Sequence, residues 1–240
     1  MESTEKPRIS VVICVKNRPD FLAQALKSLQ RQTFADWECV IVDDHSTEDI
    51  AATVGGFNEP RFRYIKNEGK PGISASRNLG NREARADWVA VADSDDINLP
   101  LRLQTMAAAI EANPDVDVFY STIYCVNDGT YDFFIWKSWQ VYDRELLYTK
   151  NHIPHGSVVY RRELVVEVGY NEELQSAVDY DLWLSLSDRR RSFLYIDQPL
   201  MVYRMHGEQI STDPVRRAQQ DANTLAIQER HRQYIEAPLG

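Results

Sequence analysis

Hydrophobic residues in the first half of the chain gather in short β-branched runs that alternate with helix-like stretches. Residues 9–15 (ISVVICV) and 37–42 (WECVIV) predict two buried strands, and residues 61–65 and 88–92 predict two more. The stretch after the first run carries apolar residues at the spacing of one helical face: Leu22, Ala25, Leu26 and Leu29. This alternation is typical of a mostly parallel sheet flanked by helices.

Proline and capping residues mark where further helices begin and end. Pro19 and Pro100 suit the first turn of a helix, Ser46-Thr47 suits another start, and residues 75–86 predict a helix of their own. The plainest break in the pattern is Asn113-Pro114, because a residue before proline is pushed out of the helical conformation.

Beyond that break the apolar pattern is more mixed. Residues 116–126 and 157–160 predict strands, residues 193–203 predict a strand pair, and residues 179–189 predict a helix. The tail from 213 to 236 is polar and helix-prone. We expect it to be a solvated closing helix rather than a partner-binding arm, and we assign it no chemistry.

Composition narrows the class of protein. The chain has 240 residues, 43% of them hydrophobic, which is enough for one large α/β domain. A net charge of -9 without a dense Lys/Arg stripe argues against nucleic acid as a partner. Neither end resembles a signal peptide or membrane span, so we expect a cytoplasmic protein. Cys14, Cys39 and Cys125 are interpreted as reduced core residues.

Polar side chains follow three of the predicted strands at the point where each strand ends. They are Lys16-Asn17-Arg18, Asp43-Asp44-His45-Ser46 and Asp93-Ser94-Asp95-Asp96. An open parallel sheet binds its ligand beyond the carboxyl ends of its strands, so these three segments are expected to line one edge.

The third segment carries the clearest chemical signal. On an extended chain Asp93 and Asp95 point the same way and can share a divalent cation or a metal-bound diphosphate. The alternative is a turn or helix cap before Pro100. Asp43-Asp44 can accept hydrogen bonds from a nucleobase or ribose, or can cap a helix instead.

The segment 67–78 (NEGKPGISASRN) combines glycines with two cations near a helix start. Lys70 and Arg77 in this setting can hold phosphate oxygens, and a plain surface turn is the alternative. The phosphate interpretation and the surface turn stay equally open on these residues alone.

The order of these motifs resembles the inverting family 2 glycosyltransferases of the GT-A fold. The likeness covers nearly the whole chain, with its densest motifs in residues 9–49 and 67–103. It implies a Rossmann-like, mostly parallel sheet flanked by helices, with a smaller mixed sheet on the acceptor side. It also implies a single domain, 1–240, whose donor half is 1–112, whose acceptor half is 113–212 and whose helical tail is 213–240.

The resemblance also implies roles for individual residues. Asp44 would contact a uracil-type base, Asp93 would bind the donor, and Asp95 would ligate Mn²⁺ or Mg²⁺. Asp179 falls where the family has its catalytic base, although Val178 stands where a second acidic residue is usual, and His206 falls where a metal- or phosphate-contacting histidine is seen. The full set of predicted donor contacts is Val15, Asn17, Asp44, Lys70, Arg77, Asp93 and Ser94.

Two of these roles have structural alternatives, and the acceptor side is less defined. Asp179 can instead cap the helix that follows it, and His206 can be a structural histidine. The aromatic stretch 131–142 suits either stacking on acceptor sugars or an ordinary half-buried strand, and 155–157 suits either an acceptor floor or a turn. The predicted acceptor contacts are Trp136, His155, Gly156 and Asp181.

The implied reaction moves a hexose or N-acetylhexosamine from a nucleoside-diphosphate sugar to a hydroxyl group, with inversion. UDP is the nucleotide expected in the donor. The acceptor would be a saccharide or lipid-linked saccharide in surface polysaccharide or glycoconjugate assembly, met in the cytoplasm or at the inner membrane face. Two alternatives are a decayed sugar-nucleotide-binding module and a sugar-1-phosphate nucleotidyltransferase. The latter should carry a glycine-rich basic loop after the first strand, where this chain has CVKNRPDF.

Overall fold

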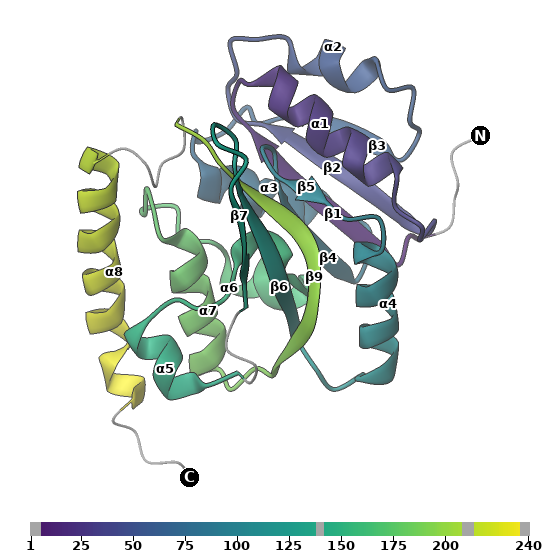
Figure 1. Ribbon diagram of the computed structural model, residues 1–240. Helices are drawn as coiled ribbons and strands as arrows, with labels where there is room; N and C mark the ends of the chain where they lie inside the picture. The colour runs from purple at the N-terminus through teal and green to yellow at the C-terminus, as the bar shows by residue number, and fades with distance from the viewer. Residues whose placement is uncertain (1–5, 138–141, 208–213, 236–240) are drawn as a thin grey trace.

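A computed structural model describes residues 6–137, 142–207 and 214–235. The strands of this part of the chain form a nine-stranded sheet in the order β3-β2-β1-β4-β8-β6-β9-β5, with β7 paired to β6 (Figure 1). Helices cover both faces of the sheet, which confirms the predicted mixed α/β fold.

The first half of the sheet is parallel, as the β-branched runs predicted. β3 (Phe62–Lys66), β2 (Trp37–Asp43), β1 (Ile9–Val15) and β4 (Trp88–Asp93) lie side by side in that order. β1 and β2 are almost wholly buried because helices cover them on both faces. Their carboxyl ends therefore meet at one edge.

The second half continues the same sheet with mixed directions. β8 (Val159–Arg161) joins β4 antiparallel and is followed by β6 (Val118–Asn127) and β9 (Phe193–Met205). The short strand β5 (Ile97–Asn98) pairs with β9, and β7 (Phe133–Trp136) pairs with β6. The expected strand pair within 193–203 is wrong, because β9 is one long strand that follows β6 with bulges.

One face of the sheet is covered by α1 (Pro19–Gln30), α2 (Ile50–Gly55) and α4 (Arg102–Ala112). Two helix starts differ from prediction. α2 begins at Ile50 rather than near residue 46, because the Asp49 side chain caps it by accepting from the Ala52 amide at 2.9 Å. α4 begins two residues after Pro100.

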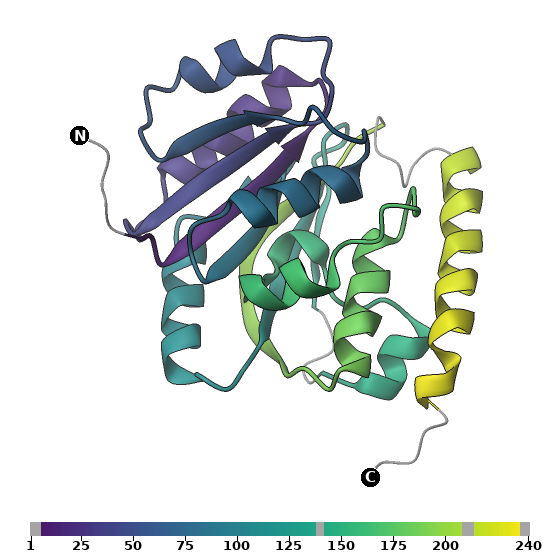
Figure 2. The same cartoon turned by 180° about the vertical axis from the view of Figure 1, so that it is seen from behind.

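The other face carries α3 (Ile73–Glu83), α6 (Arg162–Val168) and α7 (Val178–Asp188), seen from the front in Figure 2. α3 approaches the sheet closely at Gly80. A Cβ atom there would lie 2.5 Å from Val12 Cγ1, so only glycine permits this approach.

The aromatic segment does not form the half-buried strand that its alternation suggested. All four residues of β7, 133–136, are exposed, because this strand extends as the outer half of a hairpin with β6. Residues 138–141 of the aromatic stretch lie outside the described residues.

α8 (Pro214–Ile235) closes the fold beside α7 and α5 (Arg144–Thr149), as Figure 1 shows. Ile227 is fully buried and His231 is 5% exposed, so the predicted solvated helix is wrong in this respect. The helix packs against the domain along one side, a contact that its polar sequence did not reveal.

A buried charge cluster attaches α8 to α7. His231 Nδ1 lies 2.5 Å from Asp188 Oδ2, and its Nε2 lies 3.4 Å from Asp181 Oδ1. Arg230 adds a second cation 3.0 Å from Asp181 Oδ1. Burial lowers the pKa of His231, but the hydrogen bonds with Asp181 and Asp188 outweigh burial and raise this pKa to about 9.

We expect His231→Gln to destabilise the protein by about 3 kcal/mol near pH 6, because two buried carboxylates lose their shared cation. A raised folded-state pKa contributes stability that is complete below the ordinary value of 6.5 and is lost as the pH rises through about 9. Denaturant unfolding of both proteins across this pH range measures the difference. A difference that stays constant up to about pH 10 would contradict the charged state of His231.

Candidate active site

A cavity of about 660 Å³ opens beyond the carboxyl ends of β1, β2 and β4. Its walls include the three polar strand ends, the start of α7 and one residue of α8. The predicted site residues that line it are Val15, Asn17, Asp44, Arg77, Asp93, Ser94, Asp95, His155 and Asp179. Asp95 and Asp179, which are far apart in the sequence, thus face one cavity.

Asn17 connects two of the strand-end loops. Asn17 and Arg18 both have left-handed backbone, with φ of 60° and 62°. The Asn17 side-chain oxygen accepts from the Thr47 backbone amide at 2.8 Å, and the backbone amide of Asn17 donates to Ser46 Oγ at 2.7 Å. These bonds hold the ends of β1 and β2 together at the cavity wall.

Asp44 fixes the loop that leads into α3. Its carboxylate accepts from the Gly72 amide at 2.9 and 3.1 Å and from Asn67 Nδ2 at 3.3 Å. Gly72 has φ of 130°, a conformation that favours glycine. These bonds hold the start of α3 at the cavity wall, whereas residues 68–71 are exposed, as the surface-turn interpretation expects. Asp44 does not cap α2, whose N-cap is Asp49.

Asp93 is held ionised in the wall of the cavity. Arg77 donates to its Oδ1 at 3.1 Å, and His155 Nδ1 lies 3.8 Å from its Oδ2. Burial raises the pKa of Asp93, but His155 and Arg77 outweigh burial and hold this pKa well below its usual range. Burial and the neighbouring Arg77 lower the pKa of His155.

The acidic segment after β4 forms a turn. The prediction that Asp93 and Asp95 point the same way because the chain is extended is therefore wrong. Residues 94 and 95 lie in the turn, and the Asp96 amide donates to the Asp93 carbonyl at 3.3 Å. Asp96 points inward, where Arg204 N donates to its Oδ1 at 3.0 Å and burial raises the pKa of its carboxyl. Asp93 and Asp95 still line the same cavity.

Asp95 and His206 form a candidate pair of cation ligands. His206 Nε2 lies 3.2 Å from Asp95 Oδ2, and Arg18 NH1 lies 3.6 Å from the same oxygen. Among the described residues, no group of three or more His, Cys, Asp or Glu side chains is placed to hold a metal ion. A carboxylate and an imidazole are both groups that can ligate a divalent cation, but among the described residues they do not complete a metal site by themselves.

Asp179 lies in the first turn of α7. The N-cap of this helix is Ala177, with φ of 55°, so the capping interpretation of Asp179 is wrong. Its Oδ2 accepts from Asn151 Nδ2 at 2.9 Å, which orients the carboxylate within the cavity wall. A carboxylate in this position can accept a proton from a bound alcohol.

The comparisons with known proteins place this chain in a family. The family model described as Glycosyl transferase family 2 matches residues 10–169. The chain is a family 2 glycosyltransferase. The UDP-Gal:α-D-GlcNAc-diphosphoundecaprenol β-1,3-galactosyltransferase of Escherichia coli is 31% identical to it over 192 residues, covering 76% of this chain and 68% of the relative. An uncharacterised glycosyltransferase of Methanocaldococcus jannaschii is 29% identical over 208 residues, covering 84% and 72%.

Solved structures share the fold of this glycosyltransferase. TarS 1-349 of S. aureus in complex with UDP-GlcNAc has a TM-score of 0.71 at 19% identity, over 95% of this chain and 72% of that one. The mannosyltransferase PcManGT of Pyrobaculum calidifontis, in complex with GDP-Man and Mn²⁺, also has a TM-score of 0.71 at 19% identity, over 95% and 65%.

Some predicted residues of the glycosyltransferase lie outside the cavity wall. Lys70 Nζ donates to Glu173 Oε1 at 2.8 Å, and Trp136 lies on the exposed strand β7. Asp181 faces α8, as described above. Gly156 is buried, and a Cβ atom there would lie 3.3 Å from Asp93 Oδ2.

The cavity also contains residues that the sequence did not single out. Gln175, Ser176 and Tyr203 line it, and α8 adds Gln220. Tyr203 precedes the predicted His206 in one motif, but isolated polar residues such as Gln220 carry no recognisable signal in a polar helix.

The cysteines of the glycosyltransferase are free thiols, as predicted. Cys39 and Cys125 are buried, whereas Cys14 reaches the cavity wall. Burial raises the pKa of Cys14 to about 12, so it is a thiol rather than a nucleophilic thiolate at neutral pH.

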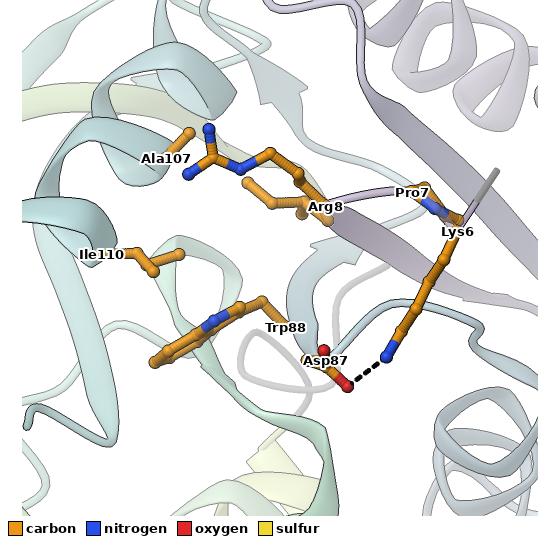
Figure 3. A pocket seen from close by; sticks show the side chains of 8 residues that line it. Lys6, Pro7, Arg8, Asp87, Trp88, Ala107 and Ile110 are labelled. Atoms are coloured by element: carbon orange, nitrogen blue, oxygen red, sulfur yellow. Dashed lines mark hydrogen bonds and ion pairs between the residues drawn. The ribbon is translucent and has the colours of Figure 1, made fainter. Parts of the chain in front are cut away.

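A smaller hollow of about 280 Å³ lies at the opposite ends of β1 and β4 (Figure 3). Lys6 Nζ and Asp87 Oδ1, which pair at 2.6 Å, line it together with Trp88 and Ile110. Lys6 pairs with Asp87, and Arg8 pairs with Glu111 at 3.6 Å, so the charged side chains of the hollow are engaged and the larger cavity is the better candidate site. None of the described helices of this glycosyltransferase is long and apolar enough to span a bilayer.

Proposed function

We propose that the protein transfers a hexose or N-acetylhexosamine from a nucleoside-diphosphate sugar to an acceptor hydroxyl with inversion, and that the nucleotide of this donor is UDP. The observation that carries this proposal is the shared cavity of Asp93, Asp95 and Asp179. A volume of about 660 Å³ suits a ligand of this size. The binding roles of the predicted donor residues, Lys70 included, are part of the proposal.

In the proposed mechanism Asp179 accepts the proton of the acceptor hydroxyl, while the oxygen of that hydroxyl forms a bond to the anomeric carbon. The bond from that carbon to the diphosphate oxygen breaks, and its electron pair leaves with the diphosphate. One displacement of this kind inverts the anomeric configuration. Asn151 orients the base through its 2.9 Å hydrogen bond.

Charge on the leaving diphosphate also needs stabilisation. Arg77 lies beside Asp93 in the cavity wall, and Asp95 with His206 would hold Mn²⁺ or Mg²⁺. When bound, the divalent ion supplies positive charge to the diphosphate oxygens. The proposed metal dependence is supported by the place of Asp95 in the cavity wall and by the Mn²⁺ in the PcManGT complex.

The names of relatives support the choice of donor and pathway. The E. coli relative uses UDP-Gal and an undecaprenol-linked acceptor by its name, which favours UDP sugars and glycoconjugate assembly for this chain. TarS is in complex with UDP-GlcNAc and PcManGT with GDP-Man, so the test of the donor includes sugars of both nucleotides. We further propose that residues 1–112 bind the donor and 113–212 the acceptor, with Trp136 and His155 as candidate acceptor contacts.

We expect one nucleotide sugar from a panel of UDP and GDP sugars to raise the melting temperature by about 5–10 °C with Mn²⁺ present. A ligand at 100 times its Kd adds about 2.7 kcal/mol, and about 2–4 °C accompanies each kcal/mol for a chain of this size. EDTA should abolish most of the shift. The proposal fails if no nucleotide sugar stabilises the protein.

Turnover then separates a transferase from a decayed binding module. Incubation of the stabilising donor with saccharide acceptors should release free nucleoside diphosphate and give a product of inverted anomeric configuration, read by NMR. Binding without any release, even by slow hydrolysis, would favour the binding module instead.

A further inference from the structure

Two glutamines line the same cavity as the proposed base Asp179. Gln175 lies four residues before Asp179 in the segment that leads into α7, and Gln220 comes from α8, which lies beside α7 in Figure 1. Neither had a predicted role. Both belong to parts of the chain beyond the family match at 10–169.

The side-chain amides of these two residues have no hydrogen-bond partner within the described part of the chain. Other amides on α8 are engaged in holding the helix in place. Asn223 Nδ2 donates to Ser176 Oγ at 2.9 Å, and Gln228 Nε2 donates to the Thr149 carbonyl at 3.0 Å. The side-chain N–H donors and carbonyl acceptors of Gln175 and Gln220, unlike those of Asn223 and Gln228, are therefore available to a ligand.

The place of the two amides is fixed by the fold. The Asn223–Ser176 bond ties α8 to the residue next to Gln175, and the His231 cluster anchors the other end of the helix on α7. Gln220 lies three residues from Asn223, one helical turn along α8. An anchored frame of this kind can present both amides to the cavity in a fixed relation to Asp179.

The chemistry of this wall differs from that of the donor wall. The strand ends contribute Arg77, Asp93 and Asp95, which suit a charged diphosphate. Gln175 and Gln220 are neutral and each offers a carbonyl acceptor and two N–H donors, the combination that pairs with sugar hydroxyls. An alcohol must lie beside Asp179 for proton transfer, so the acceptor sugar must enter the cavity that these two amides line.

We propose that Gln175 and Gln220 form the subsite that reads the hydroxyl groups of the acceptor saccharide. The inference rests on the proposed glycosyl transfer and adds to it the residues that select the acceptor. The two amides bind hydroxyls next to the one that reacts and so orient the attacking oxygen toward Asp179. Because both residues lie outside the matched family segment, acceptor choice can differ from that of the relatives while the donor wall stays alike.

The experiment compares Gln175→Ala and Gln220→Ala with wild type, using the stabilising nucleotide sugar and alkyl glycosides of glucose, galactose and N-acetylglucosamine. Each variant should raise KM for the preferred glycoside about 3–10-fold, the effect of losing one neutral hydrogen bond. KM for the donor and its slow hydrolysis should stay unchanged. Asp221→Ala, an exposed neighbour on α8 that does not line the cavity, is the matched control.

Deoxy glycosides provide the decisive readout. Wild type should disfavour one deoxy analogue of the preferred acceptor about 3–10-fold, and the corresponding glutamine variant should lose that discrimination. Gln220→Asn, which keeps the amide on a shorter stem, serves as a second variant if Gln220→Ala unfolds. A rise in donor KM, or unchanged discrimination in both alanine variants, overturns the subsite. Failure of wild type to turn over any donor overturns the proposed function instead.

Discussion

Asp179→Asn is expected to lower sugar transfer by about 10²–10⁴-fold while leaving donor binding intact. The amide has nearly the same shape as the carboxylate and can still contact Asn151, but it cannot accept the proton of the acceptor alcohol. The measurement is kcat for transfer together with the donor-induced shift in melting temperature. A general base should affect the first quantity and not the second.

Glu167→Gln is the matched control for this prediction, since Glu167 is an exposed carboxylate on α6 that does not line the cavity. It should transfer sugar at the wild-type rate. Full activity of Asp179→Asn would remove the base from the proposed mechanism. A variant that has lost donor binding would indicate a contact between Asp179 and the donor.

Asp95→Asn should reduce transfer by about 10²–10³-fold and should weaken donor binding only when Mn²⁺ is present. The reason is that Asp95 Oδ2 converges with His206 Nε2 at 3.2 Å, and an amide is a poorer ligand than a carboxylate for a hard cation. Donor titrations of wild type and variant, with Mn²⁺ and with EDTA, measure the difference.

The EDTA arm distinguishes two roles for Asp95. If Asp95 acts through a cation, both proteins should bind the donor equally weakly without metal, and His206→Gln should behave in the same way. If Asp95 contacts the donor directly, the variant binds more weakly in both arms. That second result would contradict the ligand pair.

The strand-end part of the cavity could be predicted because it depends on local pattern. The buried runs of β1, β2 and β4 fix where each strand ends, and parallel strands bring these ends to one edge. Asn17, Asp44 and Asp93 follow directly from this rule. The motif order resembling family 2 then supplied Asp179, which no strand-end argument could reach.

Residues on helices and loops were harder to assign. Asp181 is two residues from Asp179, yet it faces α8 and pairs with His231, because successive positions of a helix turn to different sides. Lys70 lies in the expected loop but reaches Glu173 across the surface. Gln220 faces the cavity only because α8 packs against α7.

The sequence by itself determined the parallel half of the sheet, the edge where its polar ends gather and the family to which the chain belongs. These depend on periodicity and motif order, which are local properties of the chain. Only the tertiary structure decided which wall α8 completes, that β9 is one strand along β6, and that Gln175 and Gln220 share a cavity with Asp179. Such contacts join residues far apart in the sequence, and their geometry is set by packing rather than by local preference.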